Sequence, residues 1–179
     1  MAARFSQMGE GGFVRGTYMG MPLTVGSKAP DFTLKTKTAE GLQDVTLSSH
    51  LGKENVVLLF YPGAFTGVCT KEMCDVTSGL DTYKNANAQV YGISNDTPFV
   101  LAEWSKQLSI GFPLLSDFQK DVAKAYDVIW PDFAGLGEGT ARAVFVIDKE
   151  GIIRHAEQTA SLGDLPNFIE VAMVLAISA

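Results

Sequence analysis

Two cysteines, Cys69 and Cys74, are the side chains of this sequence best suited to chemistry, and both fall within one expected helix. A cysteine reacts as its thiolate, which is favoured in the first turn of a helix, where unpaired N–H groups and the positive end of the helix dipole lie. Thr66 is a good N-cap residue, and no glycine or proline occurs from Val68 to Ser78, so a helix is expected to start near Gly67. Cys69 is therefore predicted to be a nucleophile, with an inert buried cysteine as the alternative.

A buried strand is expected directly before the loop that leads into this helix. The run from Val56 to Tyr61 is apolar, rich in β-branched and aromatic residues, and ends at Pro62 and Gly63, which predicts a strand buried on both faces. A second such strand is expected from Ala141 to Ile147.

Arg142 begins that second strand, next to apolar residues on both faces. A buried guanidinium needs an anionic partner, and the Cys69 thiolate is one candidate. The alternatives are an arginine that extends to solvent at the strand end or one that pairs with a structural carboxylate. Glu72, one turn after Cys69, is a candidate to orient Arg142 through a bidentate pair, or it is only a favourable acid in the first turn.

Further strands and helices alternate along the chain. Strands are expected at Ala29–Leu34 and Asp44–Leu47, both at an edge of the sheet, at Gln89–Ser94 and Phe112–Leu115, and at Ile152–Glu157 as a hairpin partner of the second buried strand. The first helix is expected to continue past Gly79 toward Tyr83, and further helices are expected from Pro98 to about Leu108 with Thr97 as the cap, at Gln119–Ala125 and at Asp164–Ala176. A long loop is expected at Ile129–Gly139. This order predicts an α/β fold with a mixed central sheet covered on both faces.

The length and net charge of the chain narrow the range of possible functions. The 179 residues suit one domain, expected over residues 23–179 after a loosely ordered extension at 1–22 that resembles neither a secretory signal nor a membrane span. The net charge of −6 and the lack of a basic run argue against nucleic-acid binding. Two cysteines within one helix are poorly placed for a structural disulfide, so a reducing, cytoplasmic location is expected. The two histidines are far apart in the sequence and do not have the spacing of zinc ligands.

Pro62, Thr66 and Cys69 form the pattern Pro-x-x-x-Thr-x-x-Cys, which resembles the peroxidatic active-site loop of the peroxiredoxins. Ala29–Leu34 resembles the usual opening of that family, and Arg142 resembles its strand arginine. The resemblance implies a thioredoxin-like (peroxiredoxin) fold with an added N-terminal hairpin. It also implies a thiol-dependent peroxidase that reduces hydrogen peroxide and organic hydroperoxides without haem, flavin or metal.

The resemblance also assigns roles. Cys69 would attack the peroxide, Thr66 and Arg142 would stabilise the transition state, and Pro62 would shield the sulfur from water. Splitting an O–O bond by in-line attack needs an activated sulfur and donors directed at the oxygens, in agreement with these roles.

Cys74 determines the catalytic cycle. The Cys-x4-Cys spacing resembles the Q-type (bacterioferritin-comigratory) peroxiredoxins, which implies that Cys74 condenses with the sulfenic acid of Cys69 to form a disulfide. Helix geometry separates residues five apart by about 8.7 Å between Cα atoms. A disulfide spans at most about 7 Å, so the helix start would have to unwind. The alternative for Cys74 is a residue that packs in the core.

The partners implied are peroxide and a thioredoxin or glutaredoxin-type reductant, with a homodimer compatible with the resemblance. Three other functions remain open: a one-cysteine peroxidase with an external resolving thiol, a redox-switched interaction or holdase protein, and a disulfide oxidoreductase. The last is disfavoured because no Cys-x-x-Cys motif occurs.

Overall fold

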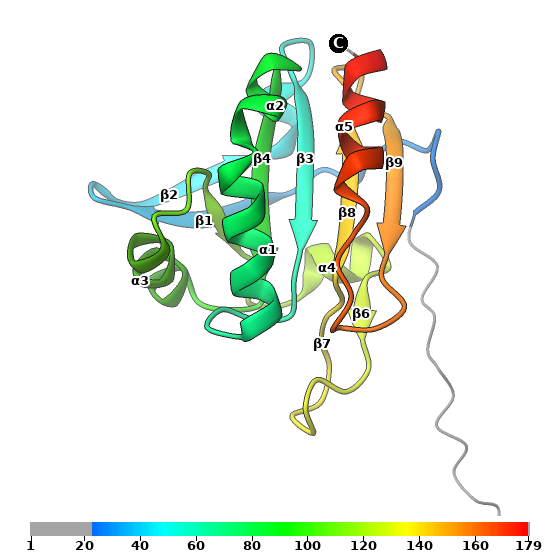
Figure 1. Ribbon diagram of the computed structural model, residues 1–179. Coiled ribbons are helices and arrows are strands. Elements are labelled where there is room, and N and C mark those ends of the chain that lie inside the picture. The colour runs from blue at the N-terminus through cyan, green and yellow to red at the C-terminus, as the bar shows by residue number, and fades with distance from the viewer. Residues whose placement is uncertain (1–22, 179) are drawn as a thin grey trace, which may run out of the picture.

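A seven-stranded mixed sheet organises residues 23–178, the part of the chain that this computed structural model describes (Figure 1). Its strands follow the order β2-β1-β5-β4-β3-β8-β9. They are β1 (Thr33–Thr38), β2 (Gly41–Thr46), β3 (Asn55–Phe60), β4 (Ala88–Ser94), β5 (Leu114–Ser116), β8 (Ala143–Ile147) and β9 (Ile153–Gln158), and a separate two-stranded sheet contains β6 (Ile129–Trp130) and β7 (Gly139–Thr140). The predicted α/β class with an N-terminal hairpin is confirmed.

Helices cover both faces of the sheet. They are η1 (Leu47–His50, a 3₁₀ turn), α1 (Gly67–Ser78), α2 (Leu80–Asn85), α3 (Pro98–Leu108), α4 (Asp121–Ala125) and α5 (Phe168–Ile177). In Figure 1, α1 and α5 lie in front of the sheet and α4 lies behind it. None of the helices within residues 23–178 has the length and apolar character needed to cross a lipid bilayer.

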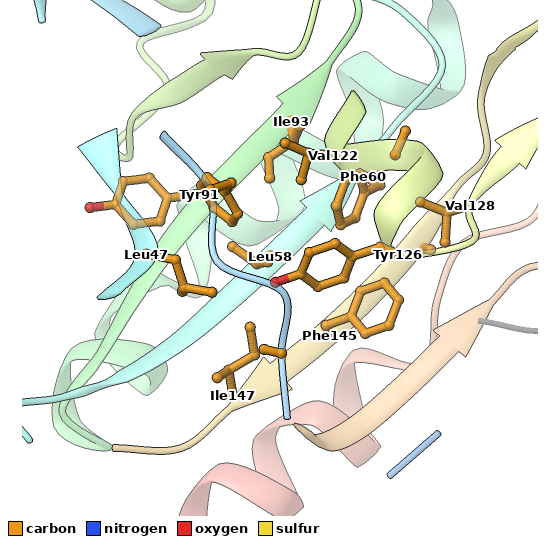
Figure 2. Close-up of a cluster of buried hydrophobic side chains, with 14 of the residues drawn as sticks. Leu47, Leu58, Phe60, Tyr91, Ile93, Val122, Tyr126, Val128, Phe145 and Ile147 are labelled. Atoms are coloured by element: carbon orange, nitrogen blue, oxygen red, sulfur yellow. The ribbon is translucent and has the colours of Figure 1, made fainter. Parts of the chain in front are cut away.

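Strand β3 lies at the centre of two apolar cores because its side chains alternate between the two faces of the sheet. Val57 and Leu59 pack with α1, α3 and α5, while Leu58 and Phe60 pack on the opposite face. Figure 2 shows this opposite core, where the ring centroids of Phe60 and Tyr126 lie 5.4 Å apart. Burial on both faces explains why β3 reads as an uninterrupted apolar run.

Helix α1 packs closely on the sheet. Gly92 in β4 leaves room for the side chains around it, since a Cβ there would lie 2.6 Å from Leu114 Cδ2, 3.2 Å from the Tyr61 ring and 3.4 Å from Met73 Sδ of α1. The helix ends at Ser78, and α2 starts again after Gly79. The predicted continuation past Gly79 is therefore a break into two helices, in line with the low helix propensity of glycine.

The N-terminal hairpin differs from the prediction in bounds and position. The first strand starts at Thr33 rather than Ala29, and just before it Asp31 accepts hydrogen bonds from the N–H groups of Phe32 and Ser48. Of these two strands, only β2 lies at an edge of the sheet, since β1 also pairs with β5 through Lys35 and Ser116.

Three other expectations need correction. The predicted loop at Ile129–Gly139 contains β6 and begins β7, which pair as an antiparallel hairpin. The last helix starts at Phe168 rather than Asp164, with the Asn167 side chain accepting from the N–H of Glu170 as its cap. The short helix starts at Asp121 rather than Gln119, and the predicted loose extension at 1–22 lies outside the described residues.

Candidate active site

The loop after β3 and the start of α1 build the site. Helix α1 begins at Gly67, as predicted, with Thr66 at the N-cap in an extended conformation. The Thr66 carbonyl accepts from the N–H of Thr70 at 2.9 Å, but the hydroxyl makes no capping bond. The hydroxyl instead donates to the Gly63 carbonyl at 3.0 Å. The Thr66 side chain is therefore not needed to cap the helix.

One face of α1 is directed at the sheet and carries the reactive groups. Its buried residues are Cys69, Glu72, Met73 and Val76, which follow helical spacing. Cys69 and Glu72 are three residues apart, so their side chains lie next to each other on this face. Cys69 is 1% exposed, so its sulfur is buried between the helix and the sheet.

Arg142 reaches both of these side chains from the neighbouring strand. Its Nη2 donates to Cys69 Sγ at 3.3 Å, and its Nη1 pairs with Glu72 Oε2. Nε and Nη2 also donate to the Leu162 carbonyl, at 3.3 and 3.0 Å. The guanidinium is 1% exposed, so the predicted burial of Arg142 is confirmed, and the structure brings it to both predicted partners. The pair with Glu72 is not the bidentate one expected, because only Oε2 of the carboxylate contacts the guanidinium.

The pairing of β3 with β8 explains why Arg142 lies next to Cys69. β3 and β8 are antiparallel neighbours, with Phe60 opposite Ala143. Arg142 immediately precedes Ala143, so it lies where β3 gives way to the cysteine loop. The cation and the helix that carries the sulfur are thus held by adjacent strands of one sheet.

Glu72 is the most buried carboxyl group of the site, with 0% exposure of its side chain. Its Oε1 accepts no hydrogen bond within the described residues. Burial raises the pKa of Glu72 from 4.5 to about 7, and the neighbouring Arg142 opposes this rise. Glu72 therefore fixes the guanidinium at the expense of its own solvation.

Cys74 lies on another side of the same helix. Five residues correspond to a rotation of about 140° from Cys69 in an α-helix. Cys74 is half-buried, and both cysteines are free thiols. The predicted separation of the two cysteines by an intact helix is what the structure shows, since α1 is continuous from Gly67 to Ser78.

Pro62 and Gly63 are buried in the loop before α1, as expected for residues that end β3. Gly63 packs against the Phe133 ring, and a Cβ added at Gly63 would lie 3.6 Å from that ring. Phe65 has a positive φ of 62°, a conformation that costs free energy in a non-glycine residue, and its ring centroid lies 6.1 Å from that of Trp104. The loop thus holds a constrained conformation next to the sulfur.

Two groups of this site were missed by the sequence analysis. The Leu162 carbonyl is a backbone group, which no residue type identifies. Asp96 accepts from the N–H of Ala64 at 2.8 Å and follows β4, which runs parallel to β3. The carboxyl ends of neighbouring parallel strands meet at one edge of the sheet. The polar residues after the predicted strand at Gln89–Ser94 could therefore have been predicted to lie near the cysteine loop.

The arrangement suits a thiolate that reacts with a small electrophile. Arg142 stabilises negative charge on Cys69 in a site shielded from water, where a charge-assisted hydrogen bond is strong. A larger hollow of about 740 Å³ lies elsewhere, lined by residues such as Phe32, Pro98 and Phe118, and its lining does not include Cys69.

Comparisons with known proteins agree with this geometry. The family model described as "AhpC/TSA family" matches residues 25–156. Alkyl hydroperoxide reductase E of Mycobacterium tuberculosis is 40% identical over 137 residues, covering 75% of this chain and 85% of that protein. The chloroplastic 2-cysteine peroxiredoxin of Chattonella marina var. antiqua is 37% identical over 143 residues, covering 76% and 71%.

Solved structures show the same likeness. The reduced 2-Cys peroxiredoxin of Plasmodium vivax superposes with a TM-score of 0.77 at 29% identity, covering 87% of this chain and 81% of that chain. Peroxidoxin BcpB of Mycobacterium tuberculosis superposes with a TM-score of 0.74 at 28% identity, covering 86% and 96%.

Proposed function

This chain belongs to the AhpC/TSA family and is a peroxiredoxin, a thiol-dependent peroxidase of thioredoxin-like fold, and we propose that Cys69 is the sulfur that attacks the peroxide. The observation that carries the proposal is the 3.3 Å contact between Arg142 Nη2 and Cys69 Sγ. A buried cation beside a buried sulfur favours the thiolate, which is the form that reacts.

The first step forms one S–O bond and breaks the O–O bond. The Cys69 thiolate attacks the terminal OH oxygen of the hydroperoxide, becomes a sulfenic acid, and releases an alkoxide or hydroxide that takes a proton from water. Arg142 stabilises the charge as it moves from sulfur to the leaving oxygen. The Thr66 hydroxyl already donates to the Gly63 carbonyl, so its oxygen is left to accept a hydrogen bond from the peroxide O–H.

We propose that Cys74 resolves the sulfenic acid. Its thiol attacks the Cys69 sulfur, a disulfide forms, and the sulfenic oxygen leaves as water. The intact α1 prevents this reaction, because the two Cα atoms of residues five apart in a helix are about 8.7 Å apart and a disulfide spans about 7 Å at most. The first turns of α1 must therefore unwind between the two steps.

A dithiol reductant completes the cycle. One structural relative, from Plasmodium yoelii, is named thioredoxin peroxidase I, and it superposes with a TM-score of 0.71 at 28% identity. Together with the exchange chemistry of a two-cysteine disulfide, this favours a thioredoxin or glutaredoxin-type protein as the reductant. The substrates proposed are hydrogen peroxide and small organic hydroperoxides, because Cys69 is only 1% exposed.

The test is a single-turnover measurement of peroxide reduction by the reduced protein. Cys69→Ser is expected to abolish it, whereas Cys74→Ser is expected to consume one equivalent of peroxide and then stop. Retained turnover in Cys69→Ser would refute the assignment of the nucleophile. Binding of client proteins without peroxide turnover in the wild type would instead favour the redox-switched interaction or holdase function.

A further inference from the structure

We propose that Asp96 is a positioning residue for the peroxidase reaction, which orients the Thr66 hydroxyl through the peptide group between Gly63 and Ala64. This inference rests on the function proposed above and adds to it a residue outside the cysteine loop. Asp96 lies in the turn after β4 and is separated from Thr66 by 30 positions along the chain.

One peptide group joins Asp96 to Thr66. Its N–H, on Ala64, donates to Asp96 Oδ2 at 2.8 Å. Its C=O, on Gly63, accepts from Thr66 Oγ1 at 3.0 Å. In a trans peptide the N–H and C=O point in opposite directions, and the described residues contain no cis peptide bond. When the carboxylate fixes the direction of the N–H, it also directs the carbonyl toward Thr66.

The carboxylate itself is held firmly. Ser94 Oγ donates to Asp96 Oδ2 at 2.8 Å, and Ser116 Oγ donates to the Asp96 backbone carbonyl at 2.7 Å. Ser94 has 0% and Ser116 8% exposure, and they end the adjacent strands β4 and β5. The position of Asp96 is therefore set by the sheet and not by the cysteine loop.

This chain of bonds has an electronic effect as well as a geometric one. A negative charge at the N–H end of a peptide makes its carbonyl oxygen a stronger acceptor, because hydrogen bonds in series polarise one another. The hydroxyl proton of Thr66 is then held in its hydrogen bond to the Gly63 carbonyl. The Thr66 oxygen becomes a better acceptor for the peroxide O–H. Asp96 thus supports peroxide binding without contacting the peroxide.

The test compares two reactions of Cys69 in the full chain. Peroxide reduction in a single turnover uses the Thr66 hydroxyl, whereas alkylation by iodoacetamide uses only the thiolate. Asp96→Ala is expected to slow peroxide reduction about tenfold and to leave alkylation within about twofold. Asp96→Asn, which retains an oxygen acceptor without the charge, is expected to fall between Asp96→Ala and the wild type. If Asp96→Ala does not fold, a peroxide rate in Asp96→Asn equal to that of the wild type overturns the proposal.

A double-mutant cycle tests whether Asp96 acts through Thr66. Thr66→Val with Asp96→Ala should react no more slowly than Thr66→Val alone, since the group that Asp96 orients is already absent. Additive losses, or equal slowing of peroxide reduction and alkylation by Asp96→Ala, would overturn the proposal. These results leave the role of Cys69 untouched, which is tested separately by Cys69→Ser.

Asp31→Ala is the matched control. Asp31 also accepts two hydrogen bonds, from the N–H groups of Phe32 and Ser48, but it lies at the start of the N-terminal hairpin. Its loss should lower thermal stability and leave the peroxide rate of the folded protein within about twofold. A tenfold loss of rate in this control would show that general destabilisation explains the Asp96 result, and would overturn the proposal.

Discussion

Arg142 Nη2 donates a hydrogen bond to Cys69 Sγ at 3.3 Å, and each of the two side chains is only 1% exposed. The same guanidinium pairs with Glu72 through Nη1 and is held by the Leu162 carbonyl. A single cation therefore contacts both the sulfur proposed as the nucleophile and a buried carboxylate, and the experiments below separate these two roles.

Replacing Arg142 by Gln should slow peroxide reduction by roughly 10- to 100-fold, the effect of one lost charge-assisted hydrogen bond of about 1.5–3 kcal/mol. Arg154→Gln is the control, because Arg154 pairs with Asp148 at a half-exposed position away from the cysteine. An unchanged peroxide rate in Arg142→Gln would remove this residue from the mechanism.

Part of the damage in Arg142→Gln is structural, since it leaves the Glu72 carboxylate buried without a cation. Breaking one partner of a buried pair costs about 3–5 kcal/mol. The double variant Arg142→Gln with Glu72→Gln should recover part of the thermal stability and none of the peroxide rate. Recovery of the rate would mean that Arg142 acts only by neutralising Glu72.

Glu72 should make stability depend on pH. Its folded-state pKa of about 7 lies above the ordinary 4.5, so between these values the folded protein holds a proton that the unfolded chain has lost. Its contribution to the free energy of unfolding is therefore complete below about pH 4.5 and is lost as pH rises to about 7. Denaturant titrations should show a change of roughly 3 kcal/mol across this window, reduced in Glu72→Gln. Equal slopes in the two proteins would contradict the prediction.

Thr66→Val should reduce the peroxide rate by roughly 10- to 100-fold, and Thr66→Ser should retain most of it. The thermal midpoint should change little, since the hydroxyl makes no capping bond and its loss removes one hydrogen bond worth about 1 kcal/mol. Thr97→Val is the matched control, because the Thr97 hydroxyl does cap α3 by accepting from the N–H of Val100. It should cost about 1 kcal/mol of stability with no loss of rate.

Oxidation by one equivalent of peroxide should remove two hydrogens from the wild-type mass, with a peptide map linking Cys69 to Cys74. Cys74→Ser should instead gain one oxygen and react with a sulfenic-acid probe. Circular dichroism should show a loss of helix in the oxidised wild type, because α1 has to unwind. A sulfenic acid that persists in the wild type would indicate a one-cysteine cycle with an external thiol.

Local signals made the best sequence predictions. The start of α1 at Gly67 and the capping of α3 by Thr97 both follow from residues within one turn of the helix end, and both are confirmed. The burial of Arg142 also followed from its apolar neighbours. Thr66 occupies the predicted N-cap position of α1, but its hydroxyl donates to the Gly63 carbonyl and makes no capping bond.

Contacts between distant segments were harder to predict. The link between Asp96 and Ala64 depends on which strands are neighbours, and a single sequence does not state this. The same limit explains why β1 was expected at the edge of the sheet, since its pairing with β5 joins segments about 80 residues apart. The catalytic roles of Cys69, Thr66, Arg142, Pro62 and Cys74 remain predictions, because they concern steps of a reaction.

The antiparallel pairing of β3 with β8 has a consequence for how this activity could be lost. Since successive residues of a strand face opposite sides, a slip of one residue in β8 would turn Arg142 toward the face away from α1. Point substitutions in either strand leave that alignment in place as long as both buried faces stay apolar. A one-residue insertion early in β8 would therefore preserve the fold and abolish the proposed peroxidase activity.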